Sequence, residues 1–98
     1  MRELLAASPK PTGLYTANIK LTVGALRALR AEGVAVPGEV EIVGFDDIAM
    51  ADLFSMPVST VCQDVEAIGR EAFKALLRVM NTQKAQRELL IPPRLKVR

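Results

Sequence analysis

A run of apolar residues at 40–45, with the sequence VEIVGF, limits what this chain can fold into more than any other feature. Its apolar side chains are nearly continuous, as they are in a parallel strand that is covered on both faces. The run stops at two adjacent acids, Asp46 and Asp47. It therefore predicts a buried strand in a parallel sheet, with a pair of carboxylates where that strand ends.

The segments around this run alternate between strand and helix patterns. The predicted elements are the end of a helix at 2–7, a strand at 12–18, a helix at 19–32, the strand at 40–45, an extended segment at 58–63, a helix at 64–80 and an edge or crossing strand at 88–97. Pro92 and Pro93 interrupt the last of these, which is why it is expected at an edge. This order predicts an α/β fold with a largely parallel sheet.

Both long helices show an apolar stripe and a start or stop signal. In the first, Gly33 is placed as the C-terminal cap, and in the second Asp64 is placed as the N-terminal cap. The first stripe consists of Ile19, Val23, Leu26 and Leu29, with Arg27 and Arg30 outside it. The second consists of Val65, Ile68, Ala72, Phe73, Leu76, Leu77 and Met80, opposite Glu66, Arg70, Glu71, Lys74 and Arg78. The second helix must therefore lie against something apolar.

Composition excludes several classes of function. The chain has 98 residues, the size of one small domain, and its 13 basic and 11 acidic residues are scattered in mixed sign, unlike the basic stripe of a nucleic-acid binder. It has no histidine and one cysteine, so the usual zinc sites and Ser/His or Cys/His catalysis cannot be built. No apolar run approaches the roughly 20 residues that span a bilayer. We expect a soluble protein without a cofactor and without a membrane partner.

Three other groups of residues have ordinary explanations. Cys62 is expected to be a small residue in a half-buried strand, because no base beside it would make it reactive. Strand alternation would place Arg94, Lys96 and Arg98 on one face, and an exposed edge is favoured there over a nucleic-acid contact. Loop packing or an interface is favoured over an aromatic platform for Met50, Phe54 and Met56.

Polar residues follow three of the predicted strands. Asn18 follows the first, Asp46 and Asp47 the second, and Gln63 ends the extended segment. Ligands of open α/β sheets bind beyond the carboxyl ends of the strands, so all four residues could meet at one rim. Carboxylates accept hydrogen bonds from hydroxyls, and amides both donate and accept, which suits a neutral polyol or a base.

Each of these residues also has a structural interpretation. Asn18 could simply cap the helix that follows it, and Gln63 could bond to backbone at the end of its strand. An acid just after a strand often caps a turn or the next helix, and Asp47 is left mainly to such a role. A third possibility, an enzyme in which Asp46 and Asp47 hold a divalent metal, is disfavoured because no phosphate-binding Lys or Gly-rich loop accompanies them.

Four stretches together resemble the C-terminal part of a known family. They are PTGLYTAN, GALRALRAEGVAVPGEVEIVGFDDI, PVSTVCQDVEAIGREAFKALL and LLIPPRLKVR. In this order and spacing they are similar to the lactose/galactose repressor family of bacterial transcription regulators, from about Pro11 to Arg98. The most specific part is VGFDD followed by a strand of the form P-x-[ST]-T-[VI]-x-Q.

The resemblance implies a sensor of the periplasmic-binding-protein type, cytoplasmic, with a small sugar or nucleobase-like effector in a cleft. It implies that residues 1–60 and 88–98 belong to a C-terminal subdomain and that 61–87 are a crossover and a helix of the N-terminal subdomain. The family's N-terminal DNA-binding headpiece is absent from these 98 residues, so the chain is expected to be a fragment that contacts operator DNA only through that headpiece. A sugar-binding protein of a transport system, which shares the fold, is the alternative.

Matched residue by residue, Asn18 and Asp46 fall on effector-contacting positions of the family, and Gln63 falls on a cleft position near the crossover. Asp47 would hold the loop. The family usually has Asp directly after the Asn, but Ile19 stands there, which puts the class of effector in doubt. The resemblance also implies a homodimer or other self-association, through a surface that includes Leu21, Ala25, Ala28 and the loop from Met50 to Met56.

Overall fold

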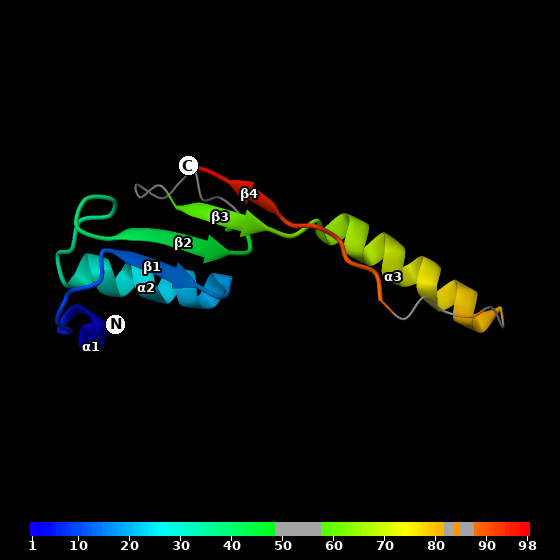
Figure 1. Ribbon diagram of the computed structural model, residues 1–98, viewed down its shortest axis with the longest axis horizontal. Coiled ribbons are helices and arrows are strands. Elements are labelled where there is room, and N and C mark those ends of the chain that lie inside the picture. Colours follow the sequence, from blue (N-terminus) through cyan, green and yellow to red (C-terminus); the bar gives the residue numbers. More distant parts are fainter. Residues whose placement is uncertain (49–57, 82–83, 85–87) are drawn as a thin grey trace. The chain divides into compact units, whose positions relative to one another are not determined.

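The computed structural model describes residues 1–48, 58–81, 84 and 88–98 (Figure 1). They fall into two compact units, one formed by Met1–Cys62 with Leu95–Arg98 and the other by Gln63–Arg94. The helices and strands are α1 (Arg2–Leu5), β1 (Gly13–Thr16), α2 (Ile19–Ala31), β2 (Glu41–Phe45), β3 (Ser59–Cys62), α3 (Val65–Met80) and β4 (Arg94–Lys96). The predicted order of strands and helices is confirmed, and of the strand expected at 88–97 only Arg94–Lys96 is regular.

The first unit is built on a sheet with the strand order β1-β2-β3-β4. β2 pairs in parallel with β1, where Thr16 lies opposite Gly44, and in parallel with β3, where Gly44 lies opposite Thr60. The arrow of β4 runs opposite to the other three in Figure 1. The prediction of an α/β fold with a largely parallel sheet is confirmed, and β4 is the edge strand that its two prolines predict.

Helix α2 lies on one face of this sheet, next to β1 and β2 (Figure 1). Its C-terminus has the Schellman geometry: Gly33 adopts a φ of 68°, and the Val34 amide donates to the Leu29 carbonyl at 2.9 Å. The predicted cap at Gly33 is therefore confirmed. Two clusters of buried side chains fill the space between helix and sheet, Ala25, Leu26, Ile42 and Val58 in one and Leu29, Val34 and Val40 in the other.

Two expectations about this unit were wrong. The buried face of α2 consists of Thr22, Ala25, Leu26 and Leu29, whereas Ile19 is 38% exposed. Strand β2 is covered on one face only: Ile42 and Gly44 are buried, but Val43 and Phe45 are half-buried and Glu41 is exposed. In the part of the chain that the structure describes, one face of β2 thus packs under α2 and the other remains partly open.

The closest approach of α2 to the sheet occurs at Gly44. Thr22 of α2 and Thr60 of β3 are fully buried beside it, and the Thr22 hydroxyl lies 2.7 Å from that of Thr16. The same hydroxyl donates to the Asn18 carbonyl at 2.9 Å, so this buried polar group is satisfied. A Cβ on residue 44 would lie 3.0 Å from the Thr22 oxygen and 3.4 Å from a Thr60 methyl. The helix can sit this close only because residue 44 has no side chain.

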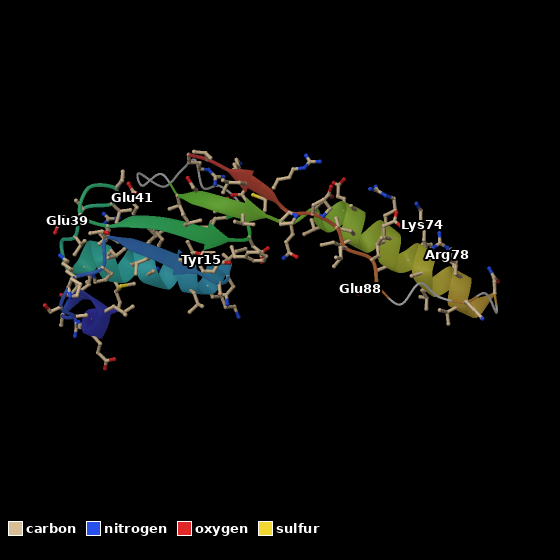
Figure 2. All side chains as sticks on the ribbon, viewed as in Figure 1. Tyr15, Glu39, Glu41, Lys74, Arg78 and Glu88 are labelled. Atoms are coloured by element: carbon tan, nitrogen blue, oxygen red, sulfur yellow. The ribbon has the colours of Figure 1, made fainter. Side chains whose placement is uncertain are left out.

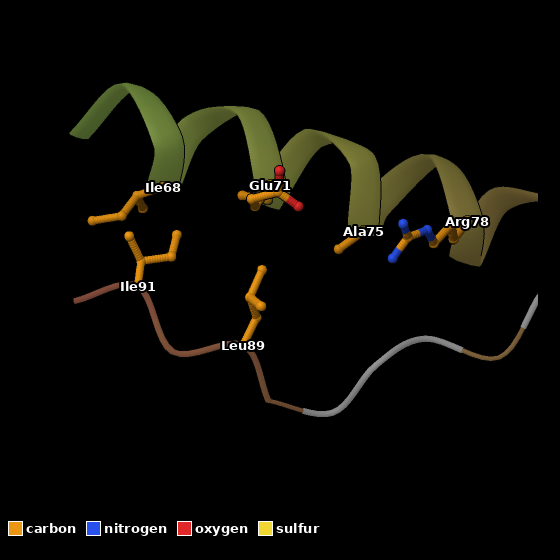
Figure 3. Close-up of a pocket in the computed structure, with 7 residues that line it drawn as sticks. Ile68, Glu71, Ala75, Arg78, Leu89 and Ile91 are labelled. Atoms are coloured by element: carbon orange, nitrogen blue, oxygen red, sulfur yellow. The ribbon is translucent and has the colours of Figure 1, made fainter. Parts of the chain in front are cut away.

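The second unit consists of α3 and the segment that follows it. Asp64 caps the helix as predicted, its carboxylate accepting from the Ala67 amide at 2.9 Å. The structure describes all of 65–80, and no residue of that helix is buried; Phe73 is 61% exposed. A shallow groove of about 330 Å³ runs along one side of α3, as Figure 3 shows. It is lined by Ile68, Glu71, Ala72, Ala75, Arg78, Leu89 and Ile91. The apolar stripe is thus present, but the described residues of this unit do not cover it.

We expect Gly44→Ala to destabilise the chain by about 1–3 kcal/mol, because Thr22 and Thr60 must move aside for the added methyl group. The measurement is the urea midpoint at constant m-value. Gly13→Ala in β1 is the matched control, since nothing lies within 4 Å of the added methyl there. Equal effects of the two substitutions would contradict the close approach of α2 at Gly44.

Candidate functional site

Asn18 stands between β1 and α2 and caps the helix. Its side-chain oxygen accepts a hydrogen bond from the Leu21 amide at 2.9 Å, and its backbone is extended, as at an N-cap. The residue is exposed, and its side-chain NH2 group carries two N–H donors that the cap does not use. Asn18 therefore has the capping role that the sequence allows, and the cap uses only the oxygen of its side chain.

Asp46 comes directly after β2 and has an unusual backbone. Its φ of 68° lies in the left-handed region, which asparagine and aspartate tolerate better than other residues with side chains. The Asp46 amide donates to the Val61 carbonyl of β3 at 2.9 Å. The chain thus turns sharply at this residue while still bonded to the neighbouring strand, and such conformations cluster at ligand-binding sites.

Asn18 and Asp46 lie at the same edge of the sheet. Thr16 of β1 and Gly44 of β2 lie opposite each other in the parallel pair. Asn18 comes two residues after Thr16, and Asp46 comes two residues after Gly44. Gln63 directly follows β3, is exposed and is the first residue of the second unit. The structure brings together the first two candidates, as the strand order predicts.

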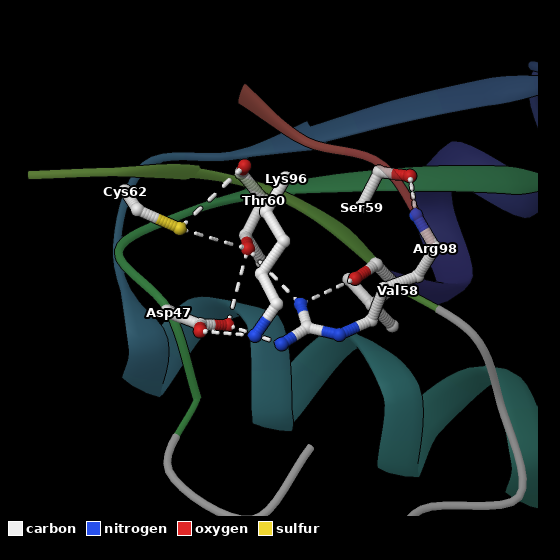
Figure 4. Close-up of polar contacts among 7 residues, drawn as sticks. All are labelled: Asp47, Val58, Ser59, Thr60, Cys62, Lys96 and Arg98. Atoms are coloured by element: carbon white, nitrogen blue, oxygen red, sulfur yellow. Dashed lines mark hydrogen bonds and ion pairs between the residues drawn. The ribbon is translucent and has the colours of Figure 1, made fainter. Parts of the chain in front are cut away.

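Asp47 has a different environment from its neighbour (Figure 4). Its Oδ1 atom accepts from the Arg98 guanidinium at 2.7 Å and from the Thr60 hydroxyl at 3.1 Å, and its Oδ2 atom accepts from the Lys96 ammonium at 3.1 Å. Two cations and a hydroxyl therefore converge on one carboxylate. Asp47 thus ties the end of β2 to β3 and to the C-terminal residues, which supports the structural role expected of it, while residues 49–57 of the loop that follows lie outside the described residues.

The same contacts shift the acidity of Asp47. Partial burial raises its pKa, but the hydrogen bonds from Arg98, Lys96 and Thr60 and the charge of Arg98 outweigh burial and lower the pKa from 3.8 to about 2. Asp47 is thus held as a carboxylate down to strongly acidic pH.

Lys96 and Arg98 are partners of Asp47 that the sequence did not predict. The expected exposed edge is present, because β4 is the last strand of the sheet and its residues are exposed. In addition, the Arg98 side chain is only 12% exposed and both residues pair with Asp47. Two features of the sequence could have suggested this pairing. Asp47 is an acid with no assigned partner, and the two basic residues lie on one side of a strand whose neighbours in the sheet were not predicted.

A metal-dependent enzyme finds no support in this geometry. Both carboxylate oxygens of Asp47 already accept from cationic side chains, which occupy the space a metal ion would need. Within the described ranges no group of three or more acidic or cysteine side chains could hold a metal ion.

Cys62 is half-buried in β3 and contacts the Thr60 hydroxyl at 3.4 Å, as expected for a small packing residue. Among the described residues no helix is long and apolar enough to cross a membrane.

Comparison with known proteins identifies the family. The model of the periplasmic binding protein-like domain matches residues 1–98. The ribose operon repressor of Haemophilus influenzae is 34% identical over 94 residues, 95% of this chain but 28% of that protein. The chain belongs to the family of periplasmic binding protein-like domains, in the form found in LacI-family transcriptional regulators.

Two solved structures show the same fold. A regulatory protein of the LacI family from Chloroflexus aggregans matches with a TM-score of 0.85 and 31% identity, over 98% of this chain and 35% of that one. A LacI-family transcriptional regulator from Arthrobacter sp. FB24, in complex with lactose, matches with a TM-score of 0.81 and 25% identity, over 97% and 36%. The chain therefore spans well under half the length of the relatives that it matches.

We expect acid to remove the stabilisation that Asp47 provides. Because its folded pKa is depressed, the contribution is fully present above the ordinary value of 3.8 and is lost as the pH falls toward about 2. At neutral pH it amounts to about 1 kcal/mol, after allowance for solvent screening of a side chain that is 34% exposed.

Urea midpoints measured at pH 7, 4 and 2 test this expectation. The Asp47→Asn variant should lose less stability over that range than the wild type, while Glu3→Gln, at an exposed acid of α1, should follow the wild type. An unchanged pH dependence in Asp47→Asn would contradict the assignment.

Proposed function

We propose that this chain is the effector-sensing and dimerisation portion of a bacterial transcriptional repressor and that it binds a small sugar or nucleobase-like ligand. Its membership of the family supports this, as do a relative that is a ribose operon repressor and a structural neighbour that was solved with lactose. The relatives described above are transcription regulators, which favours this function over that of a transport protein. Such a protein would act in the cytoplasm and would not be an enzyme.

The observation that carries the proposal is the placement of Asn18 and Asp46 at one edge of the parallel sheet. They follow β1 and β2, which pair in parallel, and ligands of open α/β sheets bind beyond the carboxyl ends of the strands. Asp46 would accept hydrogen bonds from ligand hydroxyls or ring nitrogens, and the Asn18 amide nitrogen would donate to the ligand. Gln63, which directly follows β3, stays a predicted ligand contact. No residue is assigned a catalytic role.

Most of the first unit and most of the second would belong to different subdomains of the full-length regulator, although residues 88–94 group with α3 in the second unit. Residues 1–60 and 88–98 would form part of the C-terminal subdomain, and residues 61–87 would be a crossover and a helix of the N-terminal subdomain. The exposed apolar stripe of α3 supports this division, because a helix with such a stripe needs a covering surface. Operator DNA would be bound only by an N-terminal headpiece, since these 98 residues supply no recognition helix.

A second copy of the chain would pack against α1, β1 and α2. Their exposed side chains surround a hollow of about 380 Å³ lined by Leu4, Tyr15, Lys20 and Leu21 among others, and Leu21 is 55% exposed. Ala25, named above as part of this surface, lines the same hollow but is only 7% exposed and packs in the core, so it would contribute little area to such an interface. The loop from Met50 to Met56 lies outside the described residues. Leu21 is therefore the residue of the predicted surface that best reports on dimerisation.

Ligand binding is tested by calorimetry on the full-length protein with D-ribose, lactose and adenine. For the compound that binds, Asp46→Ala should cost about 1.5–3 kcal/mol, the usual loss for a hydrogen bond that involves a charge. Asn18→Asp should also weaken binding, because it keeps the capping oxygen and removes the amide donors. Glu41→Ala is the matched control, an exposed acid at the opposite end of β2 (Figure 2). Full affinity of Asp46→Ala would contradict the role of Asp46, and failure of the wild type to bind any of the three would contradict the proposed ligand classes.

Dimerisation is tested by sedimentation of the full-length protein. Leu21→Glu places a charge on the proposed surface and should raise the dimer dissociation constant about tenfold or more, because a buried unpaired charge is costly. Arg27→Glu, at an exposed position of the same helix, is the control. A dimer that is equally stable in Leu21→Glu would remove α2 from the interface.

A further inference from the structure

Arg98 makes several hydrogen bonds near the candidate site. Besides its ion pair with Asp47, its Nη1 atom donates to the Val58 carbonyl at 3.0 Å and to the Thr60 hydroxyl at 3.1 Å. Its backbone amide donates to the Ser59 hydroxyl at 3.1 Å. All these groups belong to the first unit. The planar guanidinium thus bonds at once to β3 and to the residue after Asp46, a geometry that lysine cannot reproduce (Figure 4).

The backbone is anchored on both sides of the Asp46 Cα atom. On one side the Asp46 amide is bonded to Val61 of β3, and on the other the Asp47 carboxylate is bonded to Arg98, Lys96 and Thr60. Between these anchors the backbone adopts the left-handed conformation at Asp46. A non-glycine residue keeps such a conformation only when its surroundings determine it. The anchors on both sides supply that constraint.

Charge provides a second reason for the arrangement. Two adjacent carboxylates repel each other, and a loop that carries both would tend to turn one of them away. Arg98 and Lys96 bring two positive charges to Asp47, which removes this repulsion from the loop. Lys96 is 51% exposed and Arg98 is 12% exposed, so Arg98 contributes the less screened of the two pairs.

We propose that Asp47 and Arg98 are positioning residues that hold Asp46 in its left-handed conformation at the carboxyl edge of the sheet. They act on the ligand only through Asp46. The proposal goes beyond the binding role given to Asp46 and rests on it for its functional meaning. In this arrangement Asp47 fixes the backbone beside Asp46. Asp47 is itself held by Arg98, which lies 51 positions away in the sequence.

The test is amide hydrogen exchange, followed by NMR on the whole chain without any ligand. Asp47→Asn keeps the shape of the side chain and removes its charge. Arg98→Lys keeps a positive charge and removes the planar guanidinium with its several N–H donors. Each should speed exchange of the Asp46 amide about tenfold or more, the factor that corresponds to losing a hydrogen bond to a charged group. Amides in the middle of α2 should exchange at the wild-type rate within about threefold.

The matched control is Glu39→Gln. It breaks an ion pair of the same kind, in which Lys10 lies 3.2 Å from Glu39, at the end of the sheet where β2 begins (Figure 2). Exchange of the Asp46 amide should not change in this variant. Arg98→Lys is the milder of the two test variants and keeps the experiment decisive if Asp47→Asn does not fold.

Three outcomes would overturn the proposal. The Asp46 amide could exchange at the wild-type rate in both variants, the amides of α2 could speed up by the same factor as Asp46, or Arg98→Lys could fail to fold. The last two would give Arg98 a role in overall stability only. Because the measurement contains no ligand, it separates the two hypotheses: selective exchange at Asp46 together with unchanged sugar affinity of Asp46→Ala would keep the positioning role and remove the binding role.

Discussion

The central position of β2 is the constraint on which the rest of the first unit depends. The strand is hydrogen-bonded in parallel on both sides, to β1 and to β3, so its backbone is satisfied without help from side chains. Parallel pairing brings the carboxyl ends of all three strands to one edge, which is why Asn18 and Asp46 come together. Gly44 in the same strand admits α2 to the face of the sheet. A shift of β2 by one residue would move Gly44 away from Thr22 and would turn the buried side chains outward.

The two acids after β2 are adjacent and chemically identical, yet their backbone conformations and surroundings differ. The backbone enters the left-handed region at Asp46, whereas the Asp47 carboxylate pairs with Lys96 of β4 and with Arg98. The environment therefore gives Asp47 a structural role, and the proposed ligand contact falls on Asp46 alone. An Asp pair in a sequence does not by itself indicate a shared metal ion, since cations from the protein can take that place.

Local signals in the sequence were enough to predict most of the fold. The caps at Asn18, Gly33 and Asp64 and the helical periods depend on neighbours within one turn, and the structure contains all of them. The errors concern contacts between distant segments. The sheet decides which face of α2 is buried, and that face includes Thr22 and not Ile19. The ion pair of Asp47 with Arg98 joins residues that are far apart in the sequence, and no periodic pattern encodes such a pairing. The left-handed φ at Asp46 is likewise a backbone conformation that the sequence pattern did not predict.

The second unit raises the question of what its helix is built for. Seven apolar residues recur on one side of α3, and Val65, Phe73 and Leu76 are each more than half exposed. Full burial of one such side chain is worth roughly 1.5–3 kcal/mol, so the stripe as a whole could contribute on the order of 10 kcal/mol, as much as the entire stability of a small domain. The N-cap at Asp64 and the helical propensity of the segment can start and extend the helix, but neither requires an apolar stripe. A pattern this regular therefore indicates a covering surface supplied by residues beyond those described here, and the proposed membership of α3 in another subdomain is the arrangement that would provide one.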